Sequence, residues 1–133
     1  MLTTSLLLTA ALFSSARFGP NDTVMVEPVG EGARITAYGD TQVVKIVAED
    51  FELQDCQEAL RDKLNPGRCM FTEGGLITLS RDPLGTRLIF QDAKRGSTVE
   101  FVVDLAGRER AAKALSPCQD LQGRAFGPPC SHA

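Results

Sequence analysis

Alternating apolar and polar positions along the chain predict β-strands over much of its length. The clearest example ends at Leu105, where apolar and polar side chains fall on opposite faces: Val99, Phe101, Val103 and Leu105 against Thr98, Glu100 and Asp104. This alternation is typical of a sheet with one dry face. Two turn-forming segments, 82–85 and 92–96, divide residues 75–105 into three apolar runs. We therefore predict a three-stranded antiparallel meander there.

Shorter alternating runs precede the meander. Residues 23–28 predict a first strand, which Pro28 would place at a sheet edge. Residues 33–38 and 41–48 flank Gly39-Asp40 and predict a hairpin. Both faces of the 41–48 run are apolar, which favours a central position in the sheet. Residues 68–72 predict one more short strand.

A helical period interrupts the strands between Phe51 and Leu64. Apolar residues recur there at intervals of three and four, at Leu53, Cys56, Leu60 and Leu64. The first turns are acidic, with Glu49, Asp50, Glu52 and Asp55. Such carboxylates complement the positive end of a helix, and Asp50 is the expected cap. The functional alternatives are a calcium site or a catalytic carboxylate pair, although the spaced acidic loop of an EF-hand is absent.

A second, shorter helix is predicted over residues 107–115. Its apolar side consists of Ala111, Ala112 and Leu115, which places it at the margin of the sheet. The pattern as a whole predicts an α+β fold: one antiparallel sheet of six or seven short strands, with the main helix on one face and the short C-terminal helix beside it. Residues 17–115 would form this single domain.

An internal similarity suggests two strand-strand-strand-helix halves. Ile35-Thr36 and Ile77-Thr78 each begin a predicted hairpin, and each half ends in a helix that carries Ala-Leu, at residues 59–60 and 114–115. The alternative is convergence of short strand-turn-strand units.

The first 16 residues resemble an export signal. An apolar run from Leu6 to Phe13 is followed by Ser14 and Ala16, the small residues that a signal peptidase site requires. Cleavage between Ala16 and Arg17 would release the domain. The n-region carries no lysine or arginine, and the alternative is a buried N-terminal strand or short helix. The run is too short to remain as a membrane-spanning helix.

Four cysteines, Cys56, Cys69, Cys118 and Cys130, predict two disulfides in an exported chain. We favour the local pairing of Cys56 with Cys69 and of Cys118 with Cys130. The second bridge would tether the Pro- and Gly-rich tail, residues 116–133. The spacings do not include the C-x-x-C pairs of zinc knuckles or thioredoxin-like motifs.

Composition narrows the function further. The chain has 133 residues and a net charge of −3, with 14 basic and 17 acidic side chains. Its basic residues are scattered and most are expected to be solvated, as at Arg81, Arg87, Lys94, Arg95, Arg108 and Arg110. Tryptophan is absent and Tyr38 is the one tyrosine, so nucleic acid is not an expected partner. The single histidine, His132, stands in the tail, which is a poor place for a general base.

These observations favour a periplasmic or secreted, non-enzymatic binding domain without a cofactor or metal. Its partner would be a protein or envelope component that contacts an exposed sheet face or an edge strand. A small hydrolase using paired carboxylates is the alternative, with Asp82 and Asp92 or Glu100 and Asp104 as candidates. A cytosolic domain with free thiols is a third possibility.

Overall fold

The computed structural model describes residues 14–29, 32–62 and 67–115, and within them the strands form two antiparallel sheets. The first sheet has the order β1-β2-β3-β4 and the second the order β5-β6-β7-β8. The first contains β1 (Ser14–Arg17), β2 (Thr23–Val29), β3 (Gly32–Tyr38) and β4 (Val43–Glu49). The second contains β5 (Gly67–Met70), β6 (Gly75–Asp82), β7 (Gly85–Asp92) and β8 (Ser97–Val103). The prediction of antiparallel β-structure with two helices is confirmed, but the single sheet of six or seven strands is replaced by two sheets of four.

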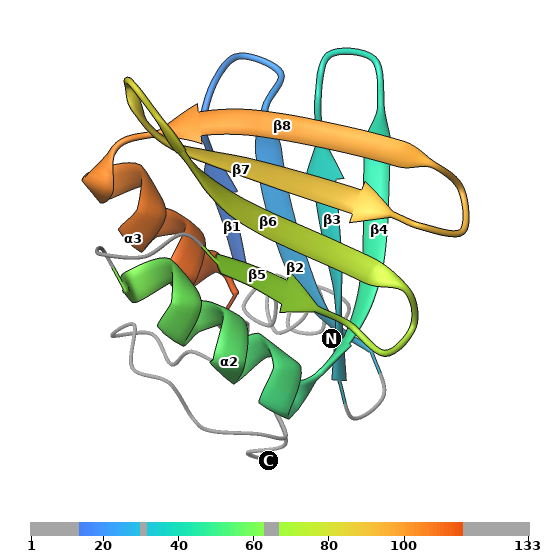
Figure 1. The fold of residues 1–133 in the computed structure, drawn as a ribbon. Helices are drawn as coiled ribbons and strands as arrows, with labels where there is room; N and C mark the ends of the chain where they lie inside the picture. Colours follow the sequence, from blue (N-terminus) through green and yellow to red (C-terminus); the bar gives the residue numbers. More distant parts are fainter. Residues whose placement is uncertain (1–13, 30–31, 63–66, 116–133) are drawn as a thin grey trace, which may run out of the picture.

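One helix follows each sheet along the chain. Helix α2 (Asp50–Arg61) follows β4, and helix α3 (Leu105–Ala114) follows β8. The second sheet lies across the first, and both helices lie on the same side of the molecule (Figure 1). Helix α2 contacts β4 and also β5 of the second sheet, whereas α3 contacts β7 and β8 and also β1 and β2 of the first. Each helix therefore helps to hold the two sheets together.

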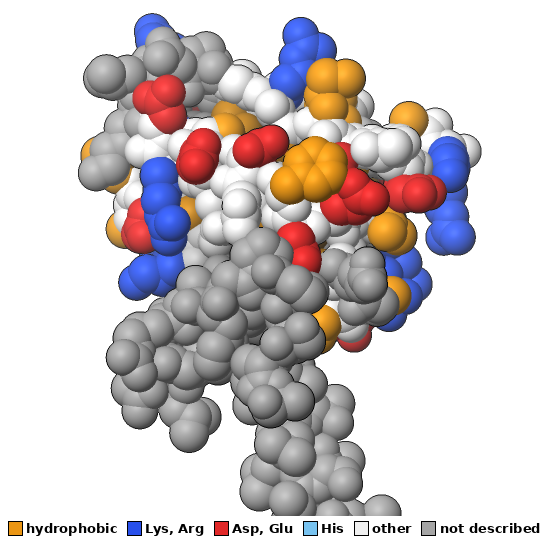
Figure 2. All heavy atoms as spheres, turned by 90° about the horizontal axis from the view of Figure 1, so that it is seen from below, with side chains coloured by type: hydrophobic (Ala, Val, Ile, Leu, Met, Phe, Trp, Pro, Cys, Tyr) orange, Lys and Arg blue, Asp and Glu red, His pale blue; other side chains and the backbone are white. Residues whose placement is uncertain are grey.

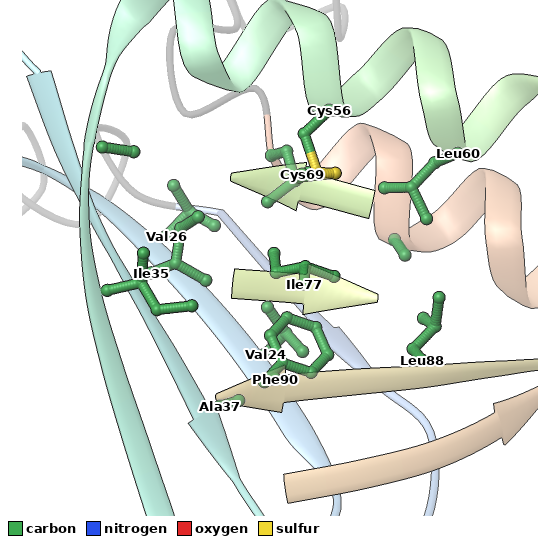
Figure 3. Close-up of a cluster of buried hydrophobic side chains, with 14 of the residues drawn as sticks. Val24, Val26, Ile35, Ala37, Cys56, Leu60, Cys69, Ile77, Leu88 and Phe90 are labelled. Carbon is green, nitrogen blue, oxygen red and sulfur yellow. A yellow bond between two sulfur atoms is a disulfide. The ribbon is translucent and has the colours of Figure 1, made fainter. Parts of the chain in front are cut away.

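The core fills the space between the two sheets and the helices. Figure 3 shows aliphatic and aromatic side chains from both sheets converging with those of α2. The fully buried members come from alternate positions of the strands and include Val24, Val26, Ile35, Ile77 and Leu88. These positions form the buried faces that the alternation predicted. The buried face of each sheet packs against the other sheet as well as against the helices, whereas one sheet covered by a helix was predicted.

Helix α2 forms where the apolar period predicted it, with Leu53, Cys56 and Leu60 buried. Its N-cap is Glu49, and the expected cap, Asp50, is the first helical residue. The reason is a capping arrangement in which the Glu52 carboxylate accepts a hydrogen bond from the Glu49 backbone N–H. The helix ends at Arg61, and Leu64, the predicted last residue, lies outside the described residues.

Arg108 on α3 is only 6 % exposed, so its assignment to the solvated basic residues was wrong. Its guanidinium group donates to backbone carbonyls at the end of α2, those of Ala59, Leu60 and Asp62, and to the Thr86 hydroxyl. The last carbonyls of a helix have no partners within the helix and carry its negative end. The Arg108 guanidinium reaches them from the neighbouring helix, where it donates hydrogen bonds to these carbonyls and places a positive charge at the negative end of α2.

Three local predictions need correction. Strand β4 lies at the edge of its sheet, and the apolar residues that suggested a central position, Val43 and Val47, are exposed. Strand β2 is internal, between β1 and β3. Its Pro28 lies past Val26, the last β2 residue that pairs with the described part of β1. Leu105 is the first residue of α3 and is exposed, because β8 ends at Val103.

The two halves have the same order of elements, four strands and a helix. Ala59-Leu60 and Ala114-Leu115 occupy equal positions when the two helices are counted from their first residues. The predicted match between Ile35-Thr36 and Ile77-Thr78 is displaced by one strand. Ile35 lies in β3, the third strand of its half, whereas Ile77 lies in β6, the second strand of the other half.

Glycine contacts give a better equivalence between the halves. Gly32 opens β3 and Gly85 opens β7. A Cβ added at Gly32 would collide with the carbonyl oxygen of Ala48, and one at Gly85 with that of Val103. Each of these carbonyls lies immediately before the N-cap of its helix. The same close approach therefore recurs at the corner where each half turns from sheet to helix.

Candidate functional site

A hollow of about 560 Å³ lies beside the first turn of α2. We call it the α2 hollow. Five segments meet there: the end of β2, the start of β3, the end of β4, the start of α2 and the residues that follow β5. Its lining residues are Val29, Gly32, Val47, Ala48, Glu49, Asp50, Phe51, Glu52, Gln54, Thr72 and Glu73.

The buried carboxylate of Glu52 fixes one wall of the α2 hollow. Its Oε1 accepts a hydrogen bond from the Glu49 N–H at 2.9 Å. Its Oε2 accepts from the backbone N–H of Thr72 at 2.8 Å and from the Thr72 hydroxyl at 3.2 Å. Both oxygens are thus used within the protein, and the residue joins the start of α2 to the segment after β5. We interpret Glu52 as a structural part of the site.

The predicted disulfide between Cys56 and Cys69 is present and strengthens the same connection. Cys56 lies one helical turn after Glu52, and Cys69 lies three residues before Thr72. The disulfide and the two hydrogen bonds from Thr72 to Glu52 therefore hold α2 against β5 and the segment that follows it. The wall of the α2 hollow is rigid at the place where Glu52, Thr72 and Glu73 line it.

Exposed apolar side chains and carboxylates occur together around the hollow. Phe51 is 57 % exposed, and Val29 and Val47 are about half exposed. The acidic lining residues are Glu49, Asp50, Glu52 and Glu73, and none of the described lining residues is basic. On the underside of the molecule, Figure 2 shows acidic side chains around exposed hydrophobic groups, with lysine and arginine toward the margins.

The corresponding corner of the second half lacks this combination. There Asp104 is the N-cap of α3, and its side chain accepts from the Gly107 N–H at 2.8 Å. Counted from the caps, the residues that replace Asp50, Phe51 and Glu52 are Leu105, Ala106 and Gly107. An acidic cap and a close-packed glycine are common to both corners, so the fold accounts for them. The further carboxylates and the exposed Phe51 are particular to the α2 corner.

The first candidate pair of catalytic carboxylates does not converge. Asp82 and Asp92 end successive strands, and Asp92 pairs with Gly75 while Asp82 pairs with Gly85. Gly75 and Asp82 are seven positions apart on β6, which corresponds to about 24 Å along a strand. Asp92 accepts hydrogen bonds from the backbone N–H groups of Lys94 and Arg95 and shapes the β7–β8 turn.

The second pair is also engaged in structure. Glu100 lies on the outer face of β8 and pairs with Arg87 at 3.1 Å, while Asp104 caps α3. Arg87 also binds Asp82 at 2.6 Å, so one guanidinium lies between two carboxylates. The Leu84 backbone N–H and then Arg87 lower the pKa of Asp82, and Glu100 and Asp82 raise that of Arg87. This arrangement is an ion-pair cluster on a sheet surface.

The remaining predicted residues fall in two groups. Ala16 and Arg17, the predicted cleavage position, lie within β1, where they pair with Val24 and Thr23. Cys118, Cys130 and His132 lie outside the described residues, as does the tail from residue 116. Processing after Ala16 and the second disulfide therefore stay predictions.

Sequence reasoning found part of the hollow and missed the rest. The acidic run at the start of α2 was noted, but Val29, Val47, Thr72 and Glu73 are brought to it by the crossing of the sheets. One signal was present in the sequence: Phe51 lies on the side of the helix opposite the apolar stripe that contains Leu53 and Cys56. An aromatic residue off the buried face of a helix is a candidate for a contact surface.

Other features of the described residues give no site. They contain no group of three or more histidine, cysteine or acidic side chains arranged to hold a metal ion. A core void lined by Val24, Leu60 and Phe90, among others, measures about 10 Å³, too small for a ligand. No helix in residues 14–29, 32–62 and 67–115 has the length and apolar character needed to cross a membrane.

Comparison with protein families, with curated proteins and with solved structures gave no significant match. The fold and the site therefore define the protein in structural terms: a repeated four-strand-and-helix arrangement with a disulfide-held helix and an acid-lined hollow.

Proposed function

We propose that the protein is a non-enzymatic binding module of an exported compartment and that the α2 hollow is its binding site. The observation that carries the proposal is the meeting of exposed Phe51 with carboxylates around a hollow of about 560 Å³. That volume lies in the range of ligand pockets. The second corner of the fold is built without this combination, so folding alone does not require it.

Two features support the exported location. The disulfide between Cys56 and Cys69 is of a kind that persists in oxidising compartments. The apolar run and the small residues before Arg17 fit a signal peptide. The partner that we propose is a protein or envelope component.

The acidic lining also keeps a carboxylate hydrolase as the second candidate. Hydrolysis by two carboxylates needs both groups to face one bond of the substrate. Of the four acids in the hollow, Glu52 has both oxygens bound to protein donors, and Glu73 lies 4.0 Å from Lys94. We assign the candidate acid pair to Glu49 and Asp50, which are neighbours at the start of α2. Turnover of ester, glycoside or peptide substrates that is lost in Glu49→Gln would favour this function over binding.

Site-specific photocrosslinking tests the binding site. A benzophenone amino acid would replace Phe51 in one variant and Leu105 in the other, two positions that are both 57 % exposed and lie at equivalent corners. Both variants would be expressed with the native leader, irradiated in the cells and recovered from the exported fraction.

We expect a discrete adduct from position 51 and none from position 105. Intact mass distinguishes a protein partner from a small ligand. The adduct should weaken when Glu49→Gln and Asp50→Asn are added. No adduct from position 51, or the same adducts from both positions, would overturn the proposal.

A further inference from the structure

If the α2 hollow is the binding site proposed above, the side chains that line it indicate the chemical class of its ligand. Four carboxylates and no described basic residue line it, in a chain with a net charge of only −3. Negative charge is therefore concentrated at this place, and carboxylates gathered around one concave surface focus the field on a cation. The positive end of α2 supplies about half an elementary charge and does not offset them.

The lining acids differ in what they already bind. Glu52 is occupied by Glu49 and Thr72, as described above. Glu73 is close to Lys94, but the pair is 4.0 Å apart and both side chains are largely exposed. Such pairs contribute little, and an incoming cation can replace the lysine. The Glu49 side chain accepts the Glu52 backbone N–H in the capping box, but a carboxylate has further acceptor positions. Glu49 and Glu73 can therefore serve as partners for a positive group, and Asp50 adds to the negative field.

Phe51 favours a guanidinium over an ammonium group. A planar guanidinium can stack on an aromatic ring and at the same time form hydrogen bonds to a carboxylate, which a compact ammonium group does less well. The protein uses this stacking elsewhere, since the Arg110 guanidinium lies 5.6 Å from the centre of the Phe18 ring. An exposed phenylalanine next to carboxylates supplies both halves of such a contact.

The surface beside the hollow is longer than a small ligand. Val47 lines the hollow, and Val43 lies four residues away on the same exposed face of the edge strand β4. Four residues of strand span about 13 Å. Lys45 stands between the two valines on the same exposed face, so the negative region ends at the hollow and the strip beside it presents two valines with one lysine between them. A polypeptide can contact both regions at once.

We infer that the α2 hollow binds an arginine side chain of another polypeptide, with its guanidinium between Phe51 and the carboxylates of Glu49 and Glu73, and with a neighbouring apolar side chain of that polypeptide against Val47. This inference deepens the proposed function and rests on it.

Selection from a random twelve-residue peptide library displayed on phage tests the inference without a known partner. Selected peptides should be enriched in arginine next to apolar residues. The best peptide would then be synthesised with arginine and with citrulline, which keeps the shape of the side chain but has no charge. We expect citrulline to weaken binding at least tenfold in fluorescence anisotropy and the arginine peptide to lose affinity as salt is raised.

Two double variants locate the effect. E49Q/D50N should weaken the arginine peptide at least tenfold and should no longer distinguish it from the citrulline peptide. D55N/E58Q removes two carboxylates from the exposed side of the same helix, outside the hollow, and should leave affinity within twofold. Thermal unfolding would verify that both variants are folded.

Enrichment without arginine, no enrichment, or equal affinity for the two synthetic peptides would overturn the inference. If selected peptides lack arginine but protect Phe51 in amide and side-chain NMR spectra, the inference fails and the proposed binding site stands. If position 51 gives no crosslink in cells, the proposed function fails as well.

Discussion

Two buried charged residues, Arg108 and Glu52, connect each helix to a segment distant in sequence. Arg108 on α3 binds the last carbonyls of α2, and Glu52 on α2 binds the Thr72 segment after β5. In both cases the charged group forms hydrogen bonds with backbone groups and a hydroxyl. Buried polar groups contribute to stability when all of their hydrogen bonds are made. These residues therefore determine how the helices sit on the sheets.

Replacing Arg108 with methionine should lower the free energy of unfolding by about 3 kcal/mol, because carbonyls at the end of α2 lose their donors in a buried place. Urea unfolding followed by circular dichroism measures the change. Arg110→Met is the matched control on the same helix: it loses only the exposed contact with Phe18 and should cost less than about 1 kcal/mol. Equal effects of the two variants would contradict the role of Arg108.

Asp82 is the residue for which pH dependence is expected. Its carboxylate accepts from the Leu84 N–H at 3.0 Å and from Arg87 at 2.6 Å, and these bonds hold its pKa below the ordinary value of 3.8. Because the pKa is lower in the folded state, the stabilisation is complete above the unfolded pKa and is lost as pH falls through the folded one.

The stability difference between the wild type and Asp82→Asn should therefore be present at pH 7 and shrink below about pH 4. Denaturant titrations at several pH values measure it, and NMR titration of the Asp82 carboxyl carbon gives the pKa directly. A midpoint at or above 3.8 would show that the hydrogen bonds do not favour the charged form.

At the scale of elements, the two strand-to-helix corners depend on close approach of backbone to backbone. Gly85 has a φ of +143°, and both Gly85 and Gly32 face the carbonyl preceding a helix cap. Gly85→Ala and Gly32→Ala should each destabilise the protein by at least about 2 kcal/mol, because a methyl group collides with backbone.

Gly67→Ala is the control for both substitutions. Gly67 has open space around it, and alanine there should change stability by less than about 0.5 kcal/mol. Thermal melts of the three variants make the comparison. If Gly32→Ala were as neutral as Gly67→Ala, the equivalence of the two corners would be lost.

Local pattern predicted most of the elements. The strands of the meander, the β3–β4 hairpin and α2 follow from alternation, turn residues and the helical period, all of which act over a few residues. The edge position of β4 was missed because exposed Val43 and Val47 make the strand apolar on both faces. The burial of Arg108 was missed because its partners are carbonyls some 46 to 49 residues away.

At the scale of the whole molecule, the candidate site arises where the halves meet. The pattern along the chain assigns one dry face to each strand, but it does not say whether two dry faces belong to one sheet or to two sheets packed together. Here the second sheet crosses the first (Figure 1), and α2 is held to β5 by the disulfide between Cys56 and Cys69 (Figure 3). That crossing brings Thr72 and Glu73 to Glu49, so the α2 hollow could not be assembled from sequence neighbours.

The predicted leader can be tested against the fold as a whole. Cleavage after Ala16 would leave Arg17 as the only described residue of β1 and would make β2 an edge strand. Strand β1 contributes little to the core, since Ala16 is buried while Ser15 and Arg17 are exposed. Phe18, whose ring stacks on Phe101 at 5.2 Å, stays with the domain.

A chain that starts at Arg17 should therefore fold and be less stable than the chain that starts at Met1 by less than about 2 kcal/mol. Intact mass and non-reducing peptide mapping of the exported protein should find Arg17 as the first residue and no free thiol among the four cysteines. Retention of Met1 with reduced cysteines would show that β1 belongs to the mature fold and that the protein works in a reducing compartment. The identity of the first residue decides between the two outcomes, because Ser14, Ser15 and Ala16 belong both to β1 and to the predicted leader. A mature chain from which the leader has been cleaved cannot contain the complete first strand.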